Sequence, residues 1–64
     1  MAFKLGTKVV VKKIYLRDIH KEINPGMVGK VLQILEGNNY LVELSIVPEG
    51  WTFEEHQLEE VDNG

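Results

Sequence analysis

Apolar and polar residues alternate with a period of two over several short stretches of this chain. In the first stretch, Val9 and Val11 fall on one face, and Lys8 and Lys12 fall on the other. A period of two is typical of a β-strand with one face buried and one face in water. The first predicted element is therefore a half-buried strand at about residues 7–13.

Two further stretches, joined by a hairpin, predict strands that continue the sheet. Residues 27–35 form an apolar run interrupted by Gly29, and a glycine inside a strand indicates a bulge, a bend or a close backbone approach. The Glu-Gly-Asn-Asn signal at 36–39 predicts a hairpin. The strand that follows the hairpin places its alternate apolar residues on one side: Tyr40, Val42 and Leu44.

The segment between the first two strands, residues 15–26, is polar with scattered apolar positions. Its Asn-Pro-Gly end favours a type II turn, since proline sets the first turn angle and glycine accepts a positive φ. We predict a long loop here. The spacing of Leu16, Ile19 and Ile23 also fits one helical turn, although so short a helix is marginal without packing.

The last third of the chain predicts two more short strands. The Pro-Glu-Gly sequence at 48–50 is expected to break the chain before a strand at 51–54, in which Trp51 and Phe53 point inward. Residues 55–57 leave room for a single 3₁₀ turn. A short strand at 58–61 then ends the fold.

A chain of 64 residues is too short for two hydrophobic cores, so we expect a single domain with an ordered core at about 5–61. Five short strands, with a long loop after the first and a 3₁₀ turn before the last, predict an all-β, closed or partly open barrel. Closure also protects strand edges from pairing with other chains.

Glycine, valine and aromatic residues recur at fixed spacings along most of the chain. The motifs are Gly6-x-x-Val9-x-Val11, Pro25-Gly26-x-x-Gly29-x-Val31, Tyr40-x-Val42-x-Leu44, Trp51-x-Phe53 and His56-x-Leu58-x-x-Val61. With these motifs the chain resembles the small stand-alone SH3-like barrel proteins, over about residues 5–61. The resemblance implies a five-stranded, partly open SH3-like barrel.

The proteins that the chain resembles are of several kinds. They include prophage proteins of the YorP type, the wider KOW and Tudor-type barrels, and photosynthetic accessory barrels: photosystem I subunit IV, the variable chain of ferredoxin–thioredoxin reductase, and PetP of the cytochrome bf complex. The photosynthetic set implies docking onto a larger complex. The motifs are requirements of the barrel and carry no chemistry of their own. The chain lacks the Ala-Leu-Tyr-Asp-Tyr segment and paired tryptophan of signalling SH3 domains, which argues against polyproline binding.

Charge is distributed unevenly along the chain, whose net charge is −3. The first thirty residues hold all seven basic side chains and two acids, a net of +5, whereas the remaining thirty-four hold eight acids and no base, a net of −8. The first and last strands tend to be neighbours in this fold. The simplest explanation of this uneven charge is pairing of Lys8 or Lys12 with Glu59 or Glu60. Each such pair is worth about 0.2–1 kcal/mol.

Composition excludes several classes of protein. The absence of cysteine excludes disulfides, thiolate metal sites and a cysteine nucleophile. Apolar runs of three or four residues are far short of the roughly 20 needed to span a bilayer, so no membrane insertion is expected. The segment Met1–Lys4 opens no signal peptide, and a cytoplasmic location is the default expectation.

No arrangement of residues in the sequence predicts catalysis. Ser45 is the only serine, His20 and His56 lie 36 positions apart, and no phosphate-binding glycine loop or metal-ligand spacing occurs. His56 is expected on the surface of the 3₁₀ turn and His20 in the long loop. We therefore expect a non-enzyme without cofactor or metal.

Aromatic residues near a long loop are common anchors of binding surfaces, because they offer a large area and lose little entropy. Trp51 is interpreted as a core or core-edge residue in preference to a ligand contact, and Tyr15 as equally suited to either role. The leading hypothesis is a monomeric interaction module or accessory subunit that binds a protein partner. Its candidate contact residues are Tyr15, Leu16, Arg17, Ile19, His20, Lys21 and Trp51.

The alternative hypothesis is a KOW or Tudor-like barrel that binds nucleic acid through a basic patch. The net acidic charge disfavours it, and lysines on strands and loops also serve simply to solvate the surface and protect edges. A steep loss of affinity with salt would distinguish nucleic-acid binding. The candidate residues are Lys12, Lys13, Arg17, Lys21 and Lys30.

Overall fold

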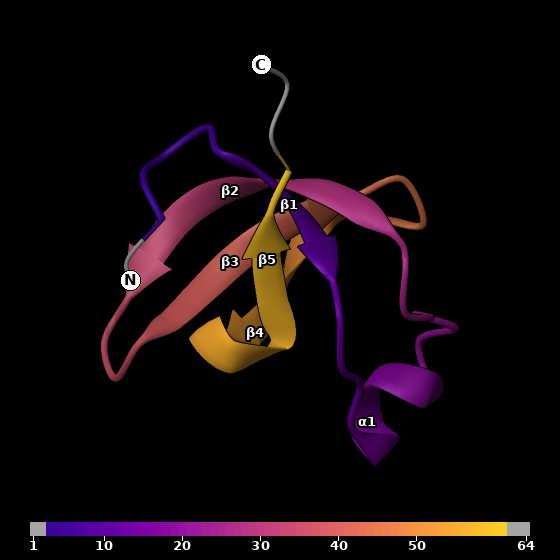
Figure 1. The fold of residues 1–64 in the computed structure, drawn as a ribbon. Helices are drawn as coiled ribbons and strands as arrows, with labels where there is room; N and C mark the ends of the chain where they lie inside the picture. Colours follow the sequence, from indigo (N-terminus) through magenta and orange to yellow (C-terminus); the bar gives the residue numbers. More distant parts are fainter. Residues whose placement is uncertain (1–2, 62–64) are drawn as a thin grey trace.

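The fold is a single, strongly curved antiparallel sheet with the strand order β4-β3-β2-β1-β5 (Figure 1). The computed structural model describes residues 3–61. This architecture is the predicted five-stranded, partly open SH3-like barrel, with one 3₁₀ turn before the last strand. The elements are β1 (Lys8–Val11), α1 (Leu16–Ile19), β2 (Val28–Leu35), β3 (Asn39–Leu44), β4 (Val47–Glu54), η1 (Glu55–Gln57) and β5 (Leu58–Glu60).

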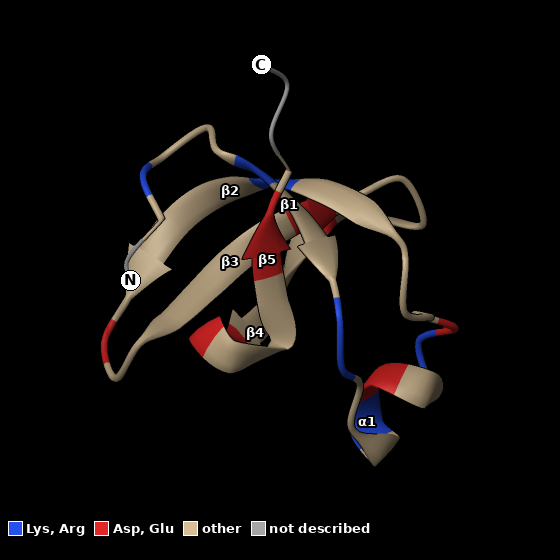
Figure 2. Ribbon diagram, viewed as in Figure 1, with Lys and Arg blue, Asp and Glu red and all other residues tan. Residues whose placement is uncertain are grey.

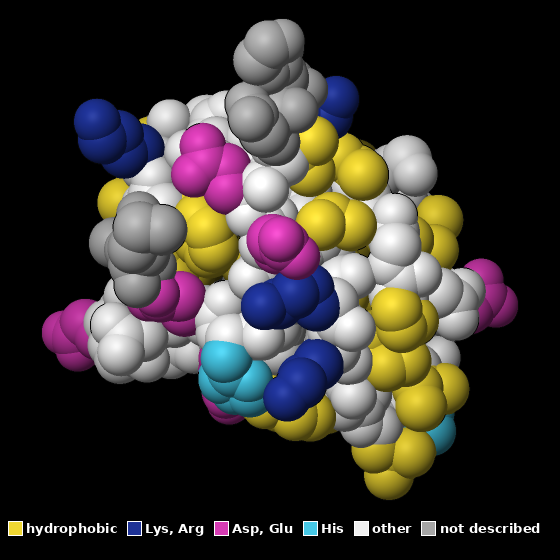
Figure 3. All heavy atoms as spheres, in the orientation of Figure 1, with side chains coloured by type: hydrophobic (Ala, Val, Ile, Leu, Met, Phe, Trp, Pro, Cys, Tyr) yellow, Lys and Arg dark blue, Asp and Glu magenta, His cyan; other side chains and the backbone are white. Residues whose placement is uncertain are grey.

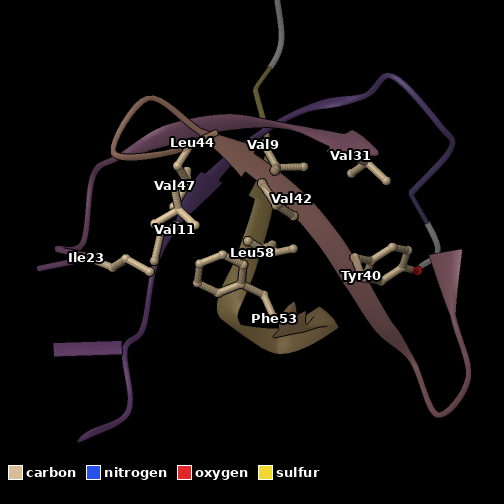
Figure 4. Packing of buried hydrophobic residues seen from close by; sticks show 10 residues of the cluster. All are labelled: Val9, Val11, Ile23, Val31, Tyr40, Val42, Leu44, Val47, Phe53 and Leu58. Carbon is tan, nitrogen blue, oxygen red and sulfur yellow. The ribbon is translucent and has the colours of Figure 1, made fainter. Parts of the chain in front are cut away.

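The inward faces of the strands form one hydrophobic core, in which side chains from the curved sheet point toward one another (Figure 4). The predicted alternation is confirmed in β1 and β3, where the apolar face is buried. In β2 only Val31 is buried, and Val28, Leu32 and Ile34 are exposed. Burying a side chain of valine or leucine size contributes about 1.5–3 kcal/mol, so the core is the main source of stability. The core residues are Val9, Val11, Ile23, Val31, Tyr40, Val42, Leu44, Val47, Phe53 and Leu58.

Strand β1 lies between β2 and β5, as expected for the first and last strands of this fold. Acidic residues therefore run along β5 beside β1, as Figure 2 shows. Within residues 3–61, however, no Lys–Glu ion pair within 4.0 Å joins these two strands. The register explains this, because Glu59 and Glu60 lie opposite Val10 and Val9.

Strands β2 and β3 form the hairpin that residues 36–39 predict. Gly29 lies close against the backbone of β3. A Cβ atom at Gly29 would overlap the carbonyl oxygen of Glu43 and would lie 2.8 Å from a side-chain carbon of Leu44. The close backbone approach predicted at this glycine is thus confirmed, and the β2–β3 register shift lies further along, between Val31 and Gln33.

The expected chain break at 48–50 is wrong. Strand β4 begins at Val47, directly after a turn at Ser45 and Ile46, and it includes Pro48 and Gly50. Proline is tolerated there because β4 is an edge strand, where a missing N–H need not remove a bond of the sheet. Phe53 points into the core as predicted, whereas Trp51 is half-buried and packs against the edge of the core.

The long connection between β1 and β2 contains the helical turn α1 and ends in the predicted type II turn. At that turn Gly26 has a φ of +97°, and the Met27 N–H donates to the Asn24 carbonyl across 3.3 Å. The Gly26 N–H then donates to the Val11 carbonyl at 2.8 Å, which returns the chain to β1. No helix in the described part of the chain is long and apolar enough to cross a membrane.

A candidate binding surface around α1 and Trp51

A buried carboxylate holds α1 against the barrel. Asp18 has no exposed surface, and its two oxygens accept three hydrogen bonds. The Tyr15 backbone N–H and the Gln57 side-chain amide both donate to Oδ2 at 2.9 Å, and the Trp51 indole N–H donates to Oδ1 at 2.7 Å. The donors come from α1 itself, from η1 and from β4. This one side chain therefore fixes a four-residue helical turn to two distant parts of the fold.

The position of Asp18 in the helix explains how α1 forms. Tyr15 is the N-cap residue, and Asp18, three residues later, accepts a hydrogen bond from its backbone N–H. This is the N3 half of a capping box, which satisfies a backbone donor that a helix otherwise leaves free. A single turn is marginal in isolation, so α1 depends on this bond and on the packing around Asp18.

Gln57 occupies the equivalent position in η1. Its Oε1 accepts from the Glu54 backbone N–H at 2.9 Å, while its Nε2 donates to the Lys13 carbonyl at 3.0 Å and to Asp18. Gln57 is as fully buried as Asp18. In residues 3–61 every buried side-chain nitrogen and oxygen has a hydrogen-bond partner, so this polar cluster carries no unsatisfied group.

Burial raises the pKa of Asp18, but its hydrogen bonds outweigh that effect. The backbone N–H of Tyr15, the Trp51 indole and the Gln57 amide all stabilise the ionised form, and the Arg17 guanidinium lies 3.8 Å from Oδ1. The net result is a pKa below the usual range of an aspartate. Asp18 is therefore ionised at neutral pH, with its negative charge directed into the protein.

Two cations lie over the face of Trp51. The Arg17 guanidinium carbon is 5.7 Å from the ring centroid and the Lys21 ammonium nitrogen is 5.5 Å from it. Both distances suit cation–π attraction. Arg17 also donates from Nη2 to the Thr52 carbonyl at 3.0 Å, which fixes it against β4. Trp51 is thus a core-edge residue with two positive charges close to its ring.

The same helical turn exposes two large apolar side chains. Leu16 is 72% exposed and Ile19 is 54% exposed. Figure 3 shows a group of hydrophobic side chains at this end of the molecule, over α1. Tyr15 and His20 are also exposed. We define the α1 surface by its residues, which α1 and β4 bring to one region: Tyr15, Leu16, Arg17, Ile19, His20, Lys21 and Trp51.

A second polar group borders the α1 surface. The Tyr15 hydroxyl lies 3.1 Å from Glu54 Oε1 and 2.8 Å from His56 Nε2, and His56 also contacts Glu54. Hydrogen bonds from His56 and Tyr15 lower the pKa of Glu54, while desolvation and the Glu54 carboxylate raise the pKa of Tyr15. Across residues 3–61, no three histidine or acidic side chains are grouped so as to hold a metal ion.

The structure places the residues of the nucleic-acid hypothesis in different surroundings. Arg17 and Lys21 lie at Trp51, whereas Lys30 lies on β2, opposite Lys8 and Glu43. Lys12 lines a hollow beside η1 and β5, in which the other charged side chains are acidic. Lys13 precedes α1 and is exposed. The titratable side chains that line the hollow with Lys12 are Glu54, Glu55, His56, Glu59 and Glu60.

Sequence reasoning places the exposed residues of this region but misses the two buried side chains that organise it. Asp18 and Gln57 each stand three residues after a cap, which is the spacing of a capping box. The residues at the caps are Tyr15 and Glu54, neither of which is a usual N-cap residue. The spacing is therefore a weak signal, and the contact between the two turns leaves no sequence signal.

Comparisons of this chain with protein-family models, with curated proteins and with solved structures find no match.

Proposed function

We propose that this protein is a small, non-catalytic interaction module or accessory subunit that binds a protein partner through the α1 surface. The observation that carries the proposal is the exposure of Leu16 and Ile19 on a turn that a buried Asp18 holds in place. Exposed apolar groups on a fixed backbone favour binding, because little conformational entropy is lost when a partner docks. Aromatic and arginine side chains, here Trp51 and Arg17, are enriched at the centres of protein interfaces.

A protein partner fits this surface better than a nucleic acid does. Nucleic-acid binding depends on several lysines and arginines that follow a phosphate backbone. Here the basic residues are divided between Trp51, an acidic hollow and strands β1 and β2. Leu16 and Ile19 offer no hydrogen bond to phosphate or to base edges, whereas they suit an apolar pocket or groove of a protein.

The proposal is tested by site-specific photocrosslinking in the organism that produces the chain. A benzophenone amino acid is placed at Leu16 and, as a matched control, at Ile46, which is 44% exposed in the turn between β3 and β4. We expect a covalent protein adduct of defined mass from position 16 and none from position 46. Equal adducts from both positions, or none from either, would contradict the proposal.

The same experiment distinguishes the alternative hypothesis. An adduct that nuclease digestion removes, and that proteolysis of the partner leaves unchanged, would indicate nucleic acid instead. A second variant, Leu16→Ala with Ile19→Ala, should abolish the adduct formed by a probe at His20. Its stability should stay within about 0.5 kcal/mol of the parent, because both side chains are exposed.

A further inference from the structure

We infer that the α1 surface selects an acidic, amphipathic peptide segment of its partner, with an apolar side chain flanked by carboxylates. The inference rests on the proposed docking function and names the chemistry of the partner. The α1 surface carries positive charges that the internal contacts of the protein leave available.

Lys21 is available to bind a carboxylate. Of the residues that the structure describes, none forms an ion pair with its ammonium group within 4.0 Å, and its charge lies over the face of Trp51. The aromatic ring holds the charge in place without neutralising it. Lys21 thus presents a positive charge at a defined position.

Arg17 adds a second positive charge beside it. Among residues 3–61 its one ion pair within 4.0 Å is with Asp18, at 3.8 Å, and its charge also acts on the Glu54 carboxylate. Because Asp18 is buried and accepts three shorter hydrogen bonds, its carboxylate is directed inward. The other nearby carboxylate, Glu54, is engaged by Tyr15 and His56. Glu22, in the same loop, is an exposed acid that reduces the local positive charge without removing it.

The apolar part of the surface belongs to the same helical turn as Arg17. Leu16 and Ile19 are three residues apart on one helical turn, so their side chains share a face. Arg17 stands between them in sequence, and Lys21 follows Ile19 by two residues. A segment that matches this pattern needs one apolar side chain for Leu16 and Ile19 and one or two carboxylates for Arg17 and Lys21.

The hollow beside β5 and η1 repels an acidic segment. The hollow beside β5 and η1 is lined by Glu54, Glu55, Glu59 and Glu60, with Lys12 and His56 among them. Complementary charge mainly sets orientation and association rate, and like charges disfavour wrong orientations. Arg17 and Lys21 are the basic side chains that lie at Trp51, so their charges would orient an acidic segment toward α1.

The probe is a displayed library of random 12-residue peptides, selected on the whole protein. We expect enriched peptides to pair Asp or Glu with Leu, Ile, Phe or Trp. When such a peptide is added, the amide resonances that shift should be those of α1 and of Trp51. Because exposed charges are screened by salt, its affinity should also fall as the salt concentration rises.

Charge reversal at the α1 surface supplies the decisive comparison. Arg17→Glu with Lys21→Glu should weaken binding of the enriched peptide by about tenfold or more, since like charges oppose docking. Lys8→Glu with Lys30→Glu changes the net charge by the same amount on exposed strand positions and should leave affinity within about twofold. Because Arg17 also contacts Asp18 and Thr52, Lys21→Glu alone is the second test variant.

The possible outcomes separate this inference from the docking proposal. Enriched peptides that are basic, uncharged or proline-rich, yet still shift α1 resonances, would overturn the acidic preference and leave the docking surface standing. Peptides that bind elsewhere, or a library that yields no binder at α1, would overturn the inference. A loss of affinity equal in both double variants would also overturn it, because it would reflect net charge alone.

Discussion

The side-chain amide of Gln57 donates a hydrogen bond to the buried carboxylate of Asp18, Nε2 to Oδ2, across 2.9 Å. Each of these residues stands at the N3 position of its own short turn, Asp18 in α1 and Gln57 in η1. Each accepts a hydrogen bond from the backbone at the start of that turn. Two turns that would be marginal alone are thus joined through the side chains that close them.

Asp18→Ala should destabilise the protein by about 2–4 kcal/mol, because the Trp51 indole and one Gln57 amide bond lose their acceptor inside the fold. Urea unfolding, followed by the fluorescence of Trp51 and by circular dichroism, measures the change. Asp18→Asn keeps the shape of the side chain and should lose less stability than Asp18→Ala. As a control, Glu36→Ala removes an exposed carboxylate and should change stability by no more than about 0.5 kcal/mol. Equal effects of Asp18→Ala and Glu36→Ala would show that the cluster contributes nothing.

The low pKa of Asp18 predicts a loss of stability in acid. In the unfolded chain its pKa is about 3.9, and folding lowers it. The ionised form therefore stabilises the fold above about pH 4, and this contribution is lost as pH falls through the folded pKa. The free-energy difference between the wild type and Asp18→Asn should shrink between pH 7 and pH 2. A difference that stays constant over this range would contradict the assignment.

Gln57→Glu replaces an amide with a carboxylate of nearly the same shape. At neutral pH it should place a second negative charge beside Asp18 and remove the donor to the Lys13 carbonyl, at a cost of about 3 kcal/mol or more. Repulsion raises the folded pKa of the new glutamate, so stability should increase as pH falls toward about 5, opposite in sign to the wild type. Gln33→Glu, the same change at an exposed position on β2, is the control and should show neither effect.

Gly29→Ala should destabilise the barrel by about 1–3 kcal/mol, because the new methyl group overlaps the Glu43 carbonyl and forces β2 and β3 apart. The neighbouring Lys30→Ala change, on the exposed face of the same strand, should cost less than about 0.5 kcal/mol. Thermal unfolding of the two variants compares them directly. A Gly29→Ala protein as stable as the wild type would mean that the strands can separate at little cost.

Much of the barrel follows from local sequence. Val9 and Val11 alternate with lysines because one face of β1 is buried, and the Asn-Pro-Gly turn follows from the angles that proline and glycine allow. The break expected at Pro48 is wrong because proline ends a central strand but not an edge strand. The position of β4 at the edge is a property of the whole sheet, which the neighbours of Pro48 in sequence do not specify.

The exposed residues of the candidate site could be predicted from the sequence. The buried hydrogen bonds that hold them in place could not. Tyr15, Leu16 and Ile19 are apolar or aromatic residues in a polar loop, and that pattern indicates a surface. An aspartate in such a loop is expected in water, since carboxylates are seldom buried. Asp18 is buried because of donors that lie 33 and 39 residues later in the chain. Contacts of that separation depend on the folded register rather than on local pattern.

That separation also sets the order in which the α1 surface can be completed. During synthesis, Leu16 and Ile19 leave the ribosome long before Trp51 and Gln57, so the nascent chain carries the apolar anchors without the hydrogen bonds that fix them. Contacts between distant residues form only after the loop between them has closed. A copy of the protein that stops short of Gln57 therefore carries Leu16 and Ile19 on a turn that is not fixed. If the α1 surface binds a partner as proposed, recognition by that partner requires a finished barrel.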